Sequence, residues 1–377
     1  MGRAAAVALS GVVLTLVAFT FDAAELFVVG VAFAALGLGA PAWVFLSTRG
    51  ASIERRLSAV RILEQEPLEA AIEVRRGRFR LAAWELRDPI AGAPVRLRGG
   101  GRRLTVRVSA HFDRRGRRCL APPSLAASDV LGLARRVCAA SDDGPRQEVL
   151  VLPRTERVRW SRGEGAAGAD RMLARWLDQS SAAVEVDGLR PYRPGTPATR
   201  IHWAALARGA GLLERRPAPD HDVRPLIILD ARAAHPAGDV DAAVRAAASL
   251  AHGLARAGGC ALLLPGERRA TAIGPDLGAW SAAHVRLALV HGGPDAPAPI
   301  LRGAPPRCVF YVVSRALSQL PAAVSAATHA GACVLVVPHP VGAQMGIARS
   351  PSFEVSGCSG FSLSGAGTVI ASRIGAG

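Results

Sequence analysis

The sequence predicts an N-terminal transmembrane helical hairpin, followed by a β-sandwich-like domain and then an α/β doubly wound domain. Three observations predict this order: two uncharged apolar segments, a region of period-two alternation, and unbroken apolar strands that alternate with helical segments after residue 222. The predicted divisions are a hairpin at 1–48, a β-rich domain at 52–153, a connector at 154–222, an α/β domain at 223–340 and a Gly/Ser/Ala-rich tail at 341–377.

The opening segments are long enough to cross a bilayer. Residues 4–21 and 26–46 carry no charged side chain. At ~1.5 Å rise per residue, a helix of either length matches a hydrocarbon core of about 30 Å. A cleaved signal peptide is the alternative for the first segment, but residues 21–24 contain no good small-x-small cleavage site. The second segment would hold the chain in the membrane even after cleavage.

The charges around these segments predict the topology. Arg3 precedes the first segment, Arg49 follows the second, and the turn between them carries Asp22 and Glu25. Because cytosolic flanks are enriched in basic residues, both termini are predicted to be cytosolic. We therefore expect two spans in the cell inner (plasma) membrane, with the remainder of the chain facing the cytosol.

The net charge of +16 raises nucleic acid or anionic lipid as partners. All of the Lys and Arg residues are Arg, which indicates a coding bias over the whole chain and not a phosphate-binding surface. Nucleic acid is therefore not the expected partner. The segment 49–118 holds 18 Arg against 8 acidic residues, so attraction to anionic headgroups and a plain solvated sheet face both remain open.

The six cysteines show no CxxC spacing and have no nearby His. Neither a zinc site nor a disulfide framework is indicated. Cys260 and Cys333 begin apolar runs, where a free thiol behaves as a small buried hydrophobe. We expect no metal and no cofactor.

Residues 70–74 and 104–112 alternate apolar and polar positions, which predicts antiparallel strands with one buried face. After residue 222 the pattern changes to a mostly parallel sheet with intervening helices. The predicted strands are 225–229, 260–264, 308–313 and 333–337, and the predicted helices are 239–257, 277–290 and 318–329. The tail from residue 341 is expected to be partly ordered at best.

The connector carries the densest motif of the chain. Its distinctive residues are Arg190, Tyr192, Gly195, Arg200, Ile201, His202, Trp203 and Arg208. The motif resembles the signature of the domain of unknown function 58 family, Arg-x-Tyr-x-x-Gly-Asp followed by Arg-x-Ile-x-Trp and Ala-Arg. Thr196 and Thr199 depart from it, in place of an acidic residue and an arginine.

The resemblance extends over nearly the whole chain. It includes the N-terminal hairpin, the pair Arg115–Gly116, the run 149–153, and an Asp-x-x-Gly-Leu element formed by Asp129, Gly132 and Leu133. It implies that the α/β domain is von Willebrand factor A-like.

Two interpretations of the motif stay open. In the structural one, Ile201 and Trp203 anchor a connector on a core, while Arg190, Arg200 and Arg208 bond to carbonyl or carboxylate groups. In the functional one, the same arginines and Tyr192 form a surface on which a partner protein docks. In either case we expect His202 to be a hydrogen-bonded packing residue and not a base.

The resemblance also locates a degenerate metal position. Von Willebrand A-like domains often bind Mg²⁺ through Asp-x-Ser-x-Ser after the first strand. Here the matching residues are Asp230, Arg232 and Ala234, so both hydroxyls are missing and a positive charge enters. Ser314 and Arg315 do not restore the ligands. We expect no metal, and Asp230 paired to an arginine instead.

No motif assigns a reaction to the chain. The patterns GxxxxGKS/T, GxSxG and HExxH are absent, and we expect no catalytic residue and no enzyme activity. The sequence favours a membrane-anchored, cytosol-facing scaffold for protein interactions. The resemblance implies that it acts with a MoxR-type AAA+ ATPase and transglutaminase-like membrane proteins in envelope or complex assembly. The alternative is an anionic-lipid or nucleic-acid binder.

Overall fold

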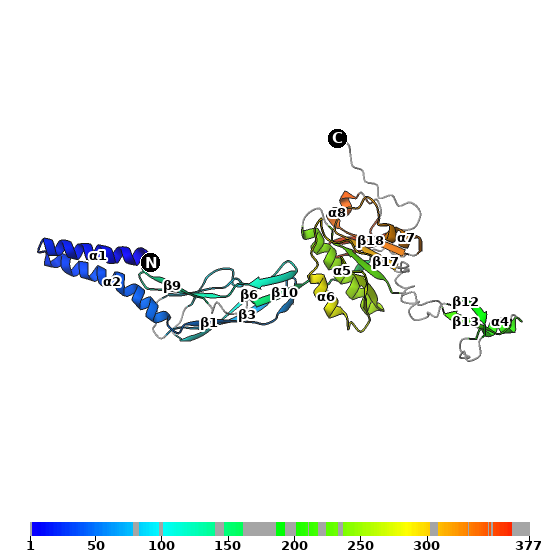
Figure 1. The fold of residues 1–377 in the computed structure, drawn as a ribbon, viewed down its shortest axis with the longest axis horizontal. Helices are drawn as coiled ribbons and strands as arrows, with labels where there is room; N and C mark the ends of the chain where they lie inside the picture. The colour runs from blue at the N-terminus through cyan, green and yellow to red at the C-terminus, as the bar shows by residue number, and fades with distance from the viewer. Residues whose placement is uncertain are drawn as a thin grey trace, which may run out of the picture. The chain divides into compact units, whose positions relative to one another are not determined.

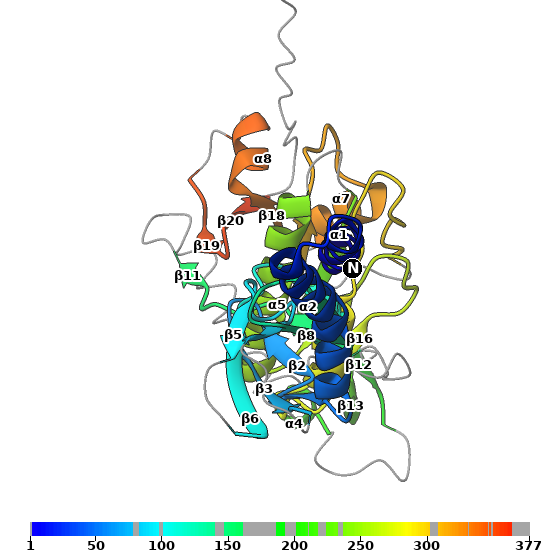
Figure 2. The same cartoon turned by 90° about the vertical axis from the view of Figure 1, so that its left-hand side faces the viewer.

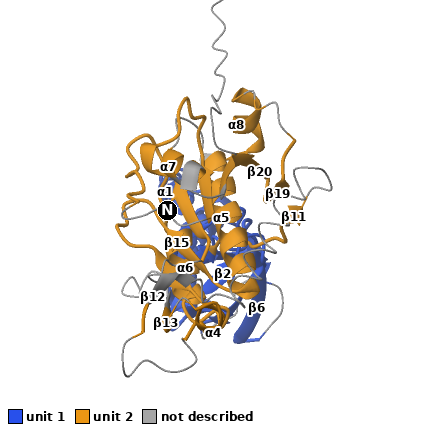
Figure 3. Cartoon of the chain, turned by 90° about the vertical axis from the view of Figure 1, so that its right-hand side faces the viewer, with its two compact units in different colours: residues 1–151 blue, residues 152–377 orange. Residues whose placement is uncertain are grey.

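A computed structural model gives the fold as two compact units, residues 1–151 and 152–377 (Figure 3). The structure describes residues 2–77, 83–97, 101–139, 147–160, 186–192, 201–209, 211–217, 224–232, 237–301, 308–330, 332–345, 347 and 350–363.

Two antiparallel helices open the first unit, α1 (Gly2–Thr20) and α2 (Ala24–Thr48), and they lie side by side (Figures 1 and 2). Both are long and apolar enough to cross a membrane. Small residues form their contact. A Cβ atom on Gly11 would collide with the backbone of Ala34, and one on Gly37 would collide with Ala8. Glycine at these positions therefore allows the close approach that holds apolar helices together in lipid.

The described residues of the β-rich part of the first unit form three sheets, ordered β1-β3-β6, β2-β10-β7 and β5-β4-β8-β9, in which the pairs β1–β3, β3–β6, β7–β10, β4–β5, β4–β8 and β8–β9 are antiparallel. Their strands are β1 Ser52–Leu57, β2 Arg61–Leu63, β3 Leu68–Arg75, β4 Ala83–Arg87, β5 Val95–Leu97, β6 Arg103–Ala110, β7 Gly116–Leu120, β8 Ser124–Ser128, β9 Arg135–Ala139 and β10 Gln147–Leu152. The predicted strands 70–74 and 104–112 are confirmed, because they lie in β3 and β6 and pair with each other. Ile72 on β3 and Leu86 on β4 belong to one buried cluster, so the β1-β3-β6 sheet and the β5-β4-β8-β9 sheet share a core.

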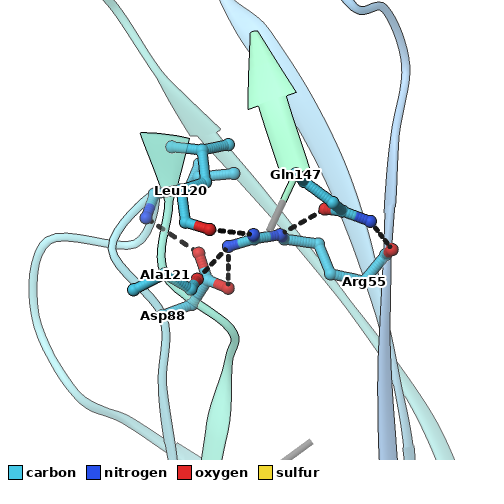
Figure 4. Close-up of polar contacts among 6 residues, drawn as sticks. Arg55, Asp88, Leu120, Ala121 and Gln147 are labelled. Atoms are coloured by element: carbon cyan, nitrogen blue, oxygen red, sulfur yellow. Dashed lines mark hydrogen bonds and ion pairs between the residues drawn. The ribbon is translucent and has the colours of Figure 1, made fainter. Parts of the chain in front are cut away.

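A buried ion pair ties this core together (Figure 4). The Arg55 guanidinium donates to the Asp88 carboxylate at 2.9 Å, to the Ala121 carbonyl at 3.0 Å and to the Leu120 carbonyl at 3.3 Å. Its Nε donates to the Gln147 side chain at 2.8 Å, and Gln147 donates back to the Arg55 carbonyl at 2.9 Å. Arg55 thus joins segments that are far apart in sequence, and its carboxylate, carbonyl and amide partners are all acceptors suited to a buried guanidinium.

The main feature of the second unit is an eight-stranded sheet ordered β11-β19-β20-β18-β17-β14-β15-β16. Its strands are β11 Arg159–Trp160, β14 Leu226–Asp230, β15 Cys260–Leu263, β16 Thr271–Ile273, β17 Cys308–Val313, β18 Ala332–Pro338, β19 Phe353–Val355 and β20 Cys358–Leu363. β15, β14, β17 and β18 run parallel, whereas the strands on both sides pair antiparallel. The sheet is therefore mixed, and the prediction of a mostly parallel sheet holds only for its centre.

Helices cover both faces of this sheet. They are α5 Ala237–Ala257, α6 Trp280–Ala288, α7 Ala322–Ala330 and α8 His339–Gln344. Ile227 on β14 packs in one cluster with Ala247 of α5, whereas its neighbour Ile228 packs in the other cluster with Val324 of α7 and Val341 of α8. Burial on both faces explains why these strands read as unbroken apolar runs.

Part of the predicted Gly/Ser/Ala-rich tail at 341–377 forms regular structure and belongs to the α/β fold. Residues 339–344 form α8, and β19 and β20 join the main sheet through β18. Small residues serve packing here, because a Cβ atom on Gly360 would collide with the ring of Phe353, which is fully buried. Residues 364–377 lie outside the described part of the chain.

Candidate functional site

The connector motif forms a small element of its own in the second unit. β12 (Val186–Pro191) and β13 (Leu213–Pro217) pair antiparallel, with Arg190 opposite Glu214. The Tyr192 amide extends the pairing by donating to the Leu212 carbonyl at 3.0 Å, and Ile201 forms a bridge with Glu214. The motif thus brings its two halves together through backbone hydrogen bonds, which sequence spacing alone did not reveal.

His202 has a structural role at the start of α4 (Trp203–Ala207). Its Nδ1 accepts the Ala205 amide at 3.1 Å, which satisfies one of the free donors of the first helical turn. Its own amide donates to the Leu213 carbonyl at 2.8 Å. This placement agrees with the expectation that His202 is a hydrogen-bonded packing residue, because its Nδ1 already accepts a backbone hydrogen bond.

The structural interpretation, in which both side chains anchor the connector on a core, fits Ile201 but not Trp203. Ile201 is 8% exposed, but Trp203 is 58% exposed. Leu206, one turn later on α4, is 41% exposed, and Leu212, next to the partner of His202, is 38% exposed. Helical spacing places Trp203 and Leu206 on one side of α4. We call Trp203, Leu206 and Leu212 the α4 patch.

The structure describes the arginines of the motif to different extents. Arg208 ends α4, where its amide donates to the Ala205 carbonyl at 3.1 Å, and its side chain is exposed. Arg190 lies in β12, but its side chain lies outside the described part. Gly195 and Arg200 also lie outside the described residues. The sequence did not predict Glu214 as a residue of this site, although it is only 1% exposed. The only sign of it in the sequence is an acidic residue between Leu213 and Arg215 in a strand.

A second polar cluster lies at the centre of the eight-stranded sheet. β14 lies between β17 and β15 in the sheet. The chain passes from β14 to β15 on one side and returns later to β17 on the other, and ligands of α/β sheets often bind at the carboxyl ends of strands at such a switch point. Asp230 is the last residue of β14, and Ser314 follows β17. Asp230 is 0% exposed. This is the expected degenerate metal position.

Four donors satisfy the Asp230 carboxylate. Arg232 donates through Nε at 2.8 Å and Nη2 at 2.6 Å, its amide donates at 3.1 Å, and the Tyr311 hydroxyl donates at 2.8 Å. Ser314 turns away from the carboxylate and donates to the Arg232 carbonyl at 3.0 Å. An ionised carboxylate has about four lone-pair sites. Among the described residues these four donors occupy the lone pairs of the carboxylate, and an arginine is a partner of Asp230 as expected.

The titration of this cluster follows from its contacts. Burial raises the pKa of Asp230, but the hydrogen bonds from Arg232 and Tyr311 outweigh it, so the pKa lies below its ordinary value. The hydrogen bond to Asp230 raises the pKa of Arg232. Burial and the Asp230 charge raise the pKa of Tyr311. Asp230 and Arg232 are thus fixed as an ion pair, and Tyr311, a buried strand residue, was missed because nothing local distinguishes it.

Histidines and cysteines supply no further chemistry that the described residues bring together. His284 Nε2 lies 2.7 Å from the Pro153 carbonyl, and its ring stacks on Trp280 at 4.6 Å. Cys260 and Cys333 are buried as predicted, and burial raises the pKa of each thiol to about 12. Within the described ranges, no three His, Cys, Asp or Glu side chains are grouped to hold a metal ion.

Comparisons with known proteins give no family assignment. No family model matches the chain, and no curated protein matches it. A solved structure, Cwp6 from Clostridium difficile, matches with 10% sequence identity and a TM-score of 0.17, over 70% of this chain and 34% of that one. The chain thus spans about a third of the length of that structure. A likeness at this score carries no argument about fold or function.

Proposed function

We propose that the protein is a membrane-anchored scaffold for protein interactions, held by α1 and α2 in the inner membrane with both termini in the cytosol. Its β-sandwich-like and von Willebrand A-like parts position the connector motif in this proposal. The observation that carries it is the α4 patch, because the motif with the strongest family resemblance exposes a tryptophan and two leucines.

The chemistry of the α4 patch suits a protein partner. Exposed Trp side chains offer a large apolar area at a low cost in conformational entropy, and Trp and Arg are enriched at the energetic centres of interfaces. Arg208 lies at the end of the same helix and is exposed. The His202 cap and the β12–β13 pairing hold the patch in place before a partner arrives, which lowers the entropic cost of binding.

The partner we propose is the one that the resemblance implies, a MoxR-type AAA+ ATPase, together with transglutaminase-like membrane proteins. Binding through the α4 patch needs no divalent cation. The Asp230 carboxylate, where a cation would otherwise be expected, is already saturated by Arg232 and Tyr311. Docking should therefore persist in the presence of a chelator.

Co-purification tests this function. The full chain is purified in mild detergent with the candidate ATPase, and Trp203→Ala and Leu206→Ala are compared with Ile300→Ala. Ile300 is a matched control, because Leu206 and Ile300 are both 41% exposed and both lie in the second unit. We expect loss of the ATPase with the first two variants and retention with the third. Equal retention by all three, with unchanged melting, would contradict the proposal.

The alternative of a lipid or nucleic-acid binder driven by arginine receives less support. Several arginines of the first unit lie against carboxylates, including Arg56 at 3.2 Å from Glu54 and Arg87 at 2.8 Å from Glu85. Such pairs reduce the local positive charge that phosphates would meet. Steeply salt-dependent binding of DNA to the full chain would revive this alternative.

A further inference from the structure

The turn between β8 and β9 exposes two consecutive apolar side chains. Val130 is 81% exposed and Leu131 is 63% exposed. Exposed apolar pairs at the tip of a hairpin are costly in water, and a contiguous exposed apolar surface marks a contact with a partner or a membrane. The turn contains the Asp-x-x-Gly-Leu element of residues 129–133, which the proposed docking through the α4 patch does not involve.

The turn is held rigidly in this conformation. The Asp129 carboxylate accepts the Leu131 amide at 3.0 Å and the Ala134 amide at 2.7 Å, and the Asp129 amide donates to the Ala134 carbonyl at 3.2 Å. Gly132 has φ +69°, a conformation that side chains disfavour. The apolar pair is therefore presented by a preformed loop and needs little ordering to bind.

The turn lies on the side of the first unit that faces the membrane helices. β8 and β9 contact α2, and β9 lies beside the membrane helices in Figure 1. The Arg136 guanidinium lies 4.6 Å from the ring centroid of Phe45, near the end of α2. From Arg136, β9 runs to Ala139, which pairs with Ser124 at the opposite end of the sheet.

That opposite end is distant from the helices. Ser124 pairs with Arg87, whose neighbour Asp88 binds Arg55 on the strand that leads away from α2. β9 therefore runs away from the helices, and the turn that precedes it projects back toward them.

The other end of the same sheet provides a comparison within the chain. The turn after β4 uses the same device, because the Asp88 carboxylate accepts the Ile90 amide at 2.8 Å and Gly92 has φ +67°. Its apolar residue is packed in the core, and Ile90 is only 3% exposed. Exposure of apolar side chains is thus not a property of this turn type, and it occurs at the end that lies beside α2.

We propose that Val130 and Leu131 insert into the interface of the bilayer that α1 and α2 span, at the boundary between headgroups and acyl chains. This inference rests on the proposed membrane anchoring. Arg136 lies beside Phe45 of α2 and Arg49 follows that helix, so guanidinium groups flank the insertion at the level of the phosphates. The contact fixes the orientation of the β-rich part on the membrane, which one pair of helices alone leaves free to tilt.

The experiment uses the full-length chain in phosphatidylcholine and phosphatidylglycerol vesicles. Cys119→Ser and Cys138→Ser remove the two cysteines that are not buried. An environment-sensitive fluorophore is then attached at Leu131→Cys, and at Val130→Cys as a second reporter. Val60→Cys is the matched control, because Val60 is 66% exposed but follows the far end of β1.

We expect a blue shift and quenching by shallow nitroxide lipids at positions 130 and 131, at least threefold stronger than at position 60. A label at Leu16→Cys in α1 reports the anchoring separately through deep nitroxide lipids. Quenching at 16 without quenching at 130 and 131 overturns this inference alone, whereas no quenching at 16 overturns the anchoring as well. A blue shift that grows with protein concentration and lacks lipid quenching indicates a second copy of the chain, and also overturns it.

Discussion

Arg232 lies against Asp230 in a two-point ion pair, with Nε 2.8 Å from Oδ1 and Nη2 2.6 Å from Oδ2. The two residues are separated by one position in the chain, so the pair forms at the strand end where the sheet connections diverge. A guanidinium covalently tethered to the chain thus supplies the positive charge that a buried carboxylate requires.

Removing this guanidinium should destabilise the second unit. Arg232→Ala leaves the buried Asp230 carboxylate without an opposite charge, and we expect a loss of about 3 kcal/mol in the free energy of unfolding. Denaturant titration of the full chain in detergent measures it. Arg268→Ala, at an exposed position, should change the stability by less than about 0.5 kcal/mol. A cost below 1 kcal/mol for Arg232→Ala would show that Tyr311 and the amide are sufficient partners.

Acid should weaken the same cluster. Because the pKa of Asp230 is lower in the folded state than its ordinary value, its contribution to stability is present above the unfolded pKa and is lost as the pH falls through the folded pKa. Asp230→Asn should therefore flatten the decline in stability below about pH 4. Melting temperatures of both proteins between pH 5 and pH 2 check this. Parallel curves would contradict it.

His284 should make stability depend on pH in a different window. Burial lowers its pKa despite the hydrogen bond to the Pro153 carbonyl. A histidine held neutral stabilises the fold above its unfolded pKa of about 6.5, and this contribution declines as the pH falls below that value. His284→Gln keeps a donor and should reduce the slope of stability between pH 7 and pH 5. His252, across Trp280, also has a lowered pKa, so part of the slope should remain.

The close contact of the two apolar helices predicts a strong positional effect. Gly11→Leu would drive a side chain into the Ala34 backbone, so we expect the helices to separate and the protein to lose about 1–3 kcal/mol. Gly39→Leu in α2 is the control, because no atom lies within 4 Å of its added Cβ. Thermal unfolding in detergent distinguishes the two, and similar melting temperatures would contradict the helix contact.

The sequence located those elements whose burial leaves a continuous signal. β17 begins and ends where its apolar run does, at Cys308 and Val313, and α5 differs from its prediction by two residues at the start. β17 is buried on both faces of the sheet, which selects apolar residues at every position. α5 packs against one face only, and its acidic first turn and the glycines that follow it marked its bounds.

The parts that were missed depend on packing that small or isolated residues conceal. β20 contains Gly360 because Phe353 covers it, and glycine in a Ser-rich stretch predicts a loop when its neighbour in space is unknown. The exposure of Trp203 was also missed. An aromatic residue close to an apolar one in sequence suggests burial, and only the positions of the surrounding strands show that it is exposed.

The buried Arg55 cluster also limits how early the β-rich part can fold during synthesis. Arg55 leaves the ribosome 33 residues before Asp88 and 92 residues before Gln147. Until those partners are synthesised, its guanidinium stays hydrated, and β10 is not available to pair with β2 and β7. The nascent β-rich part therefore completes its fold only when synthesis has passed residue 147, about 100 residues after the end of α2 at Thr48.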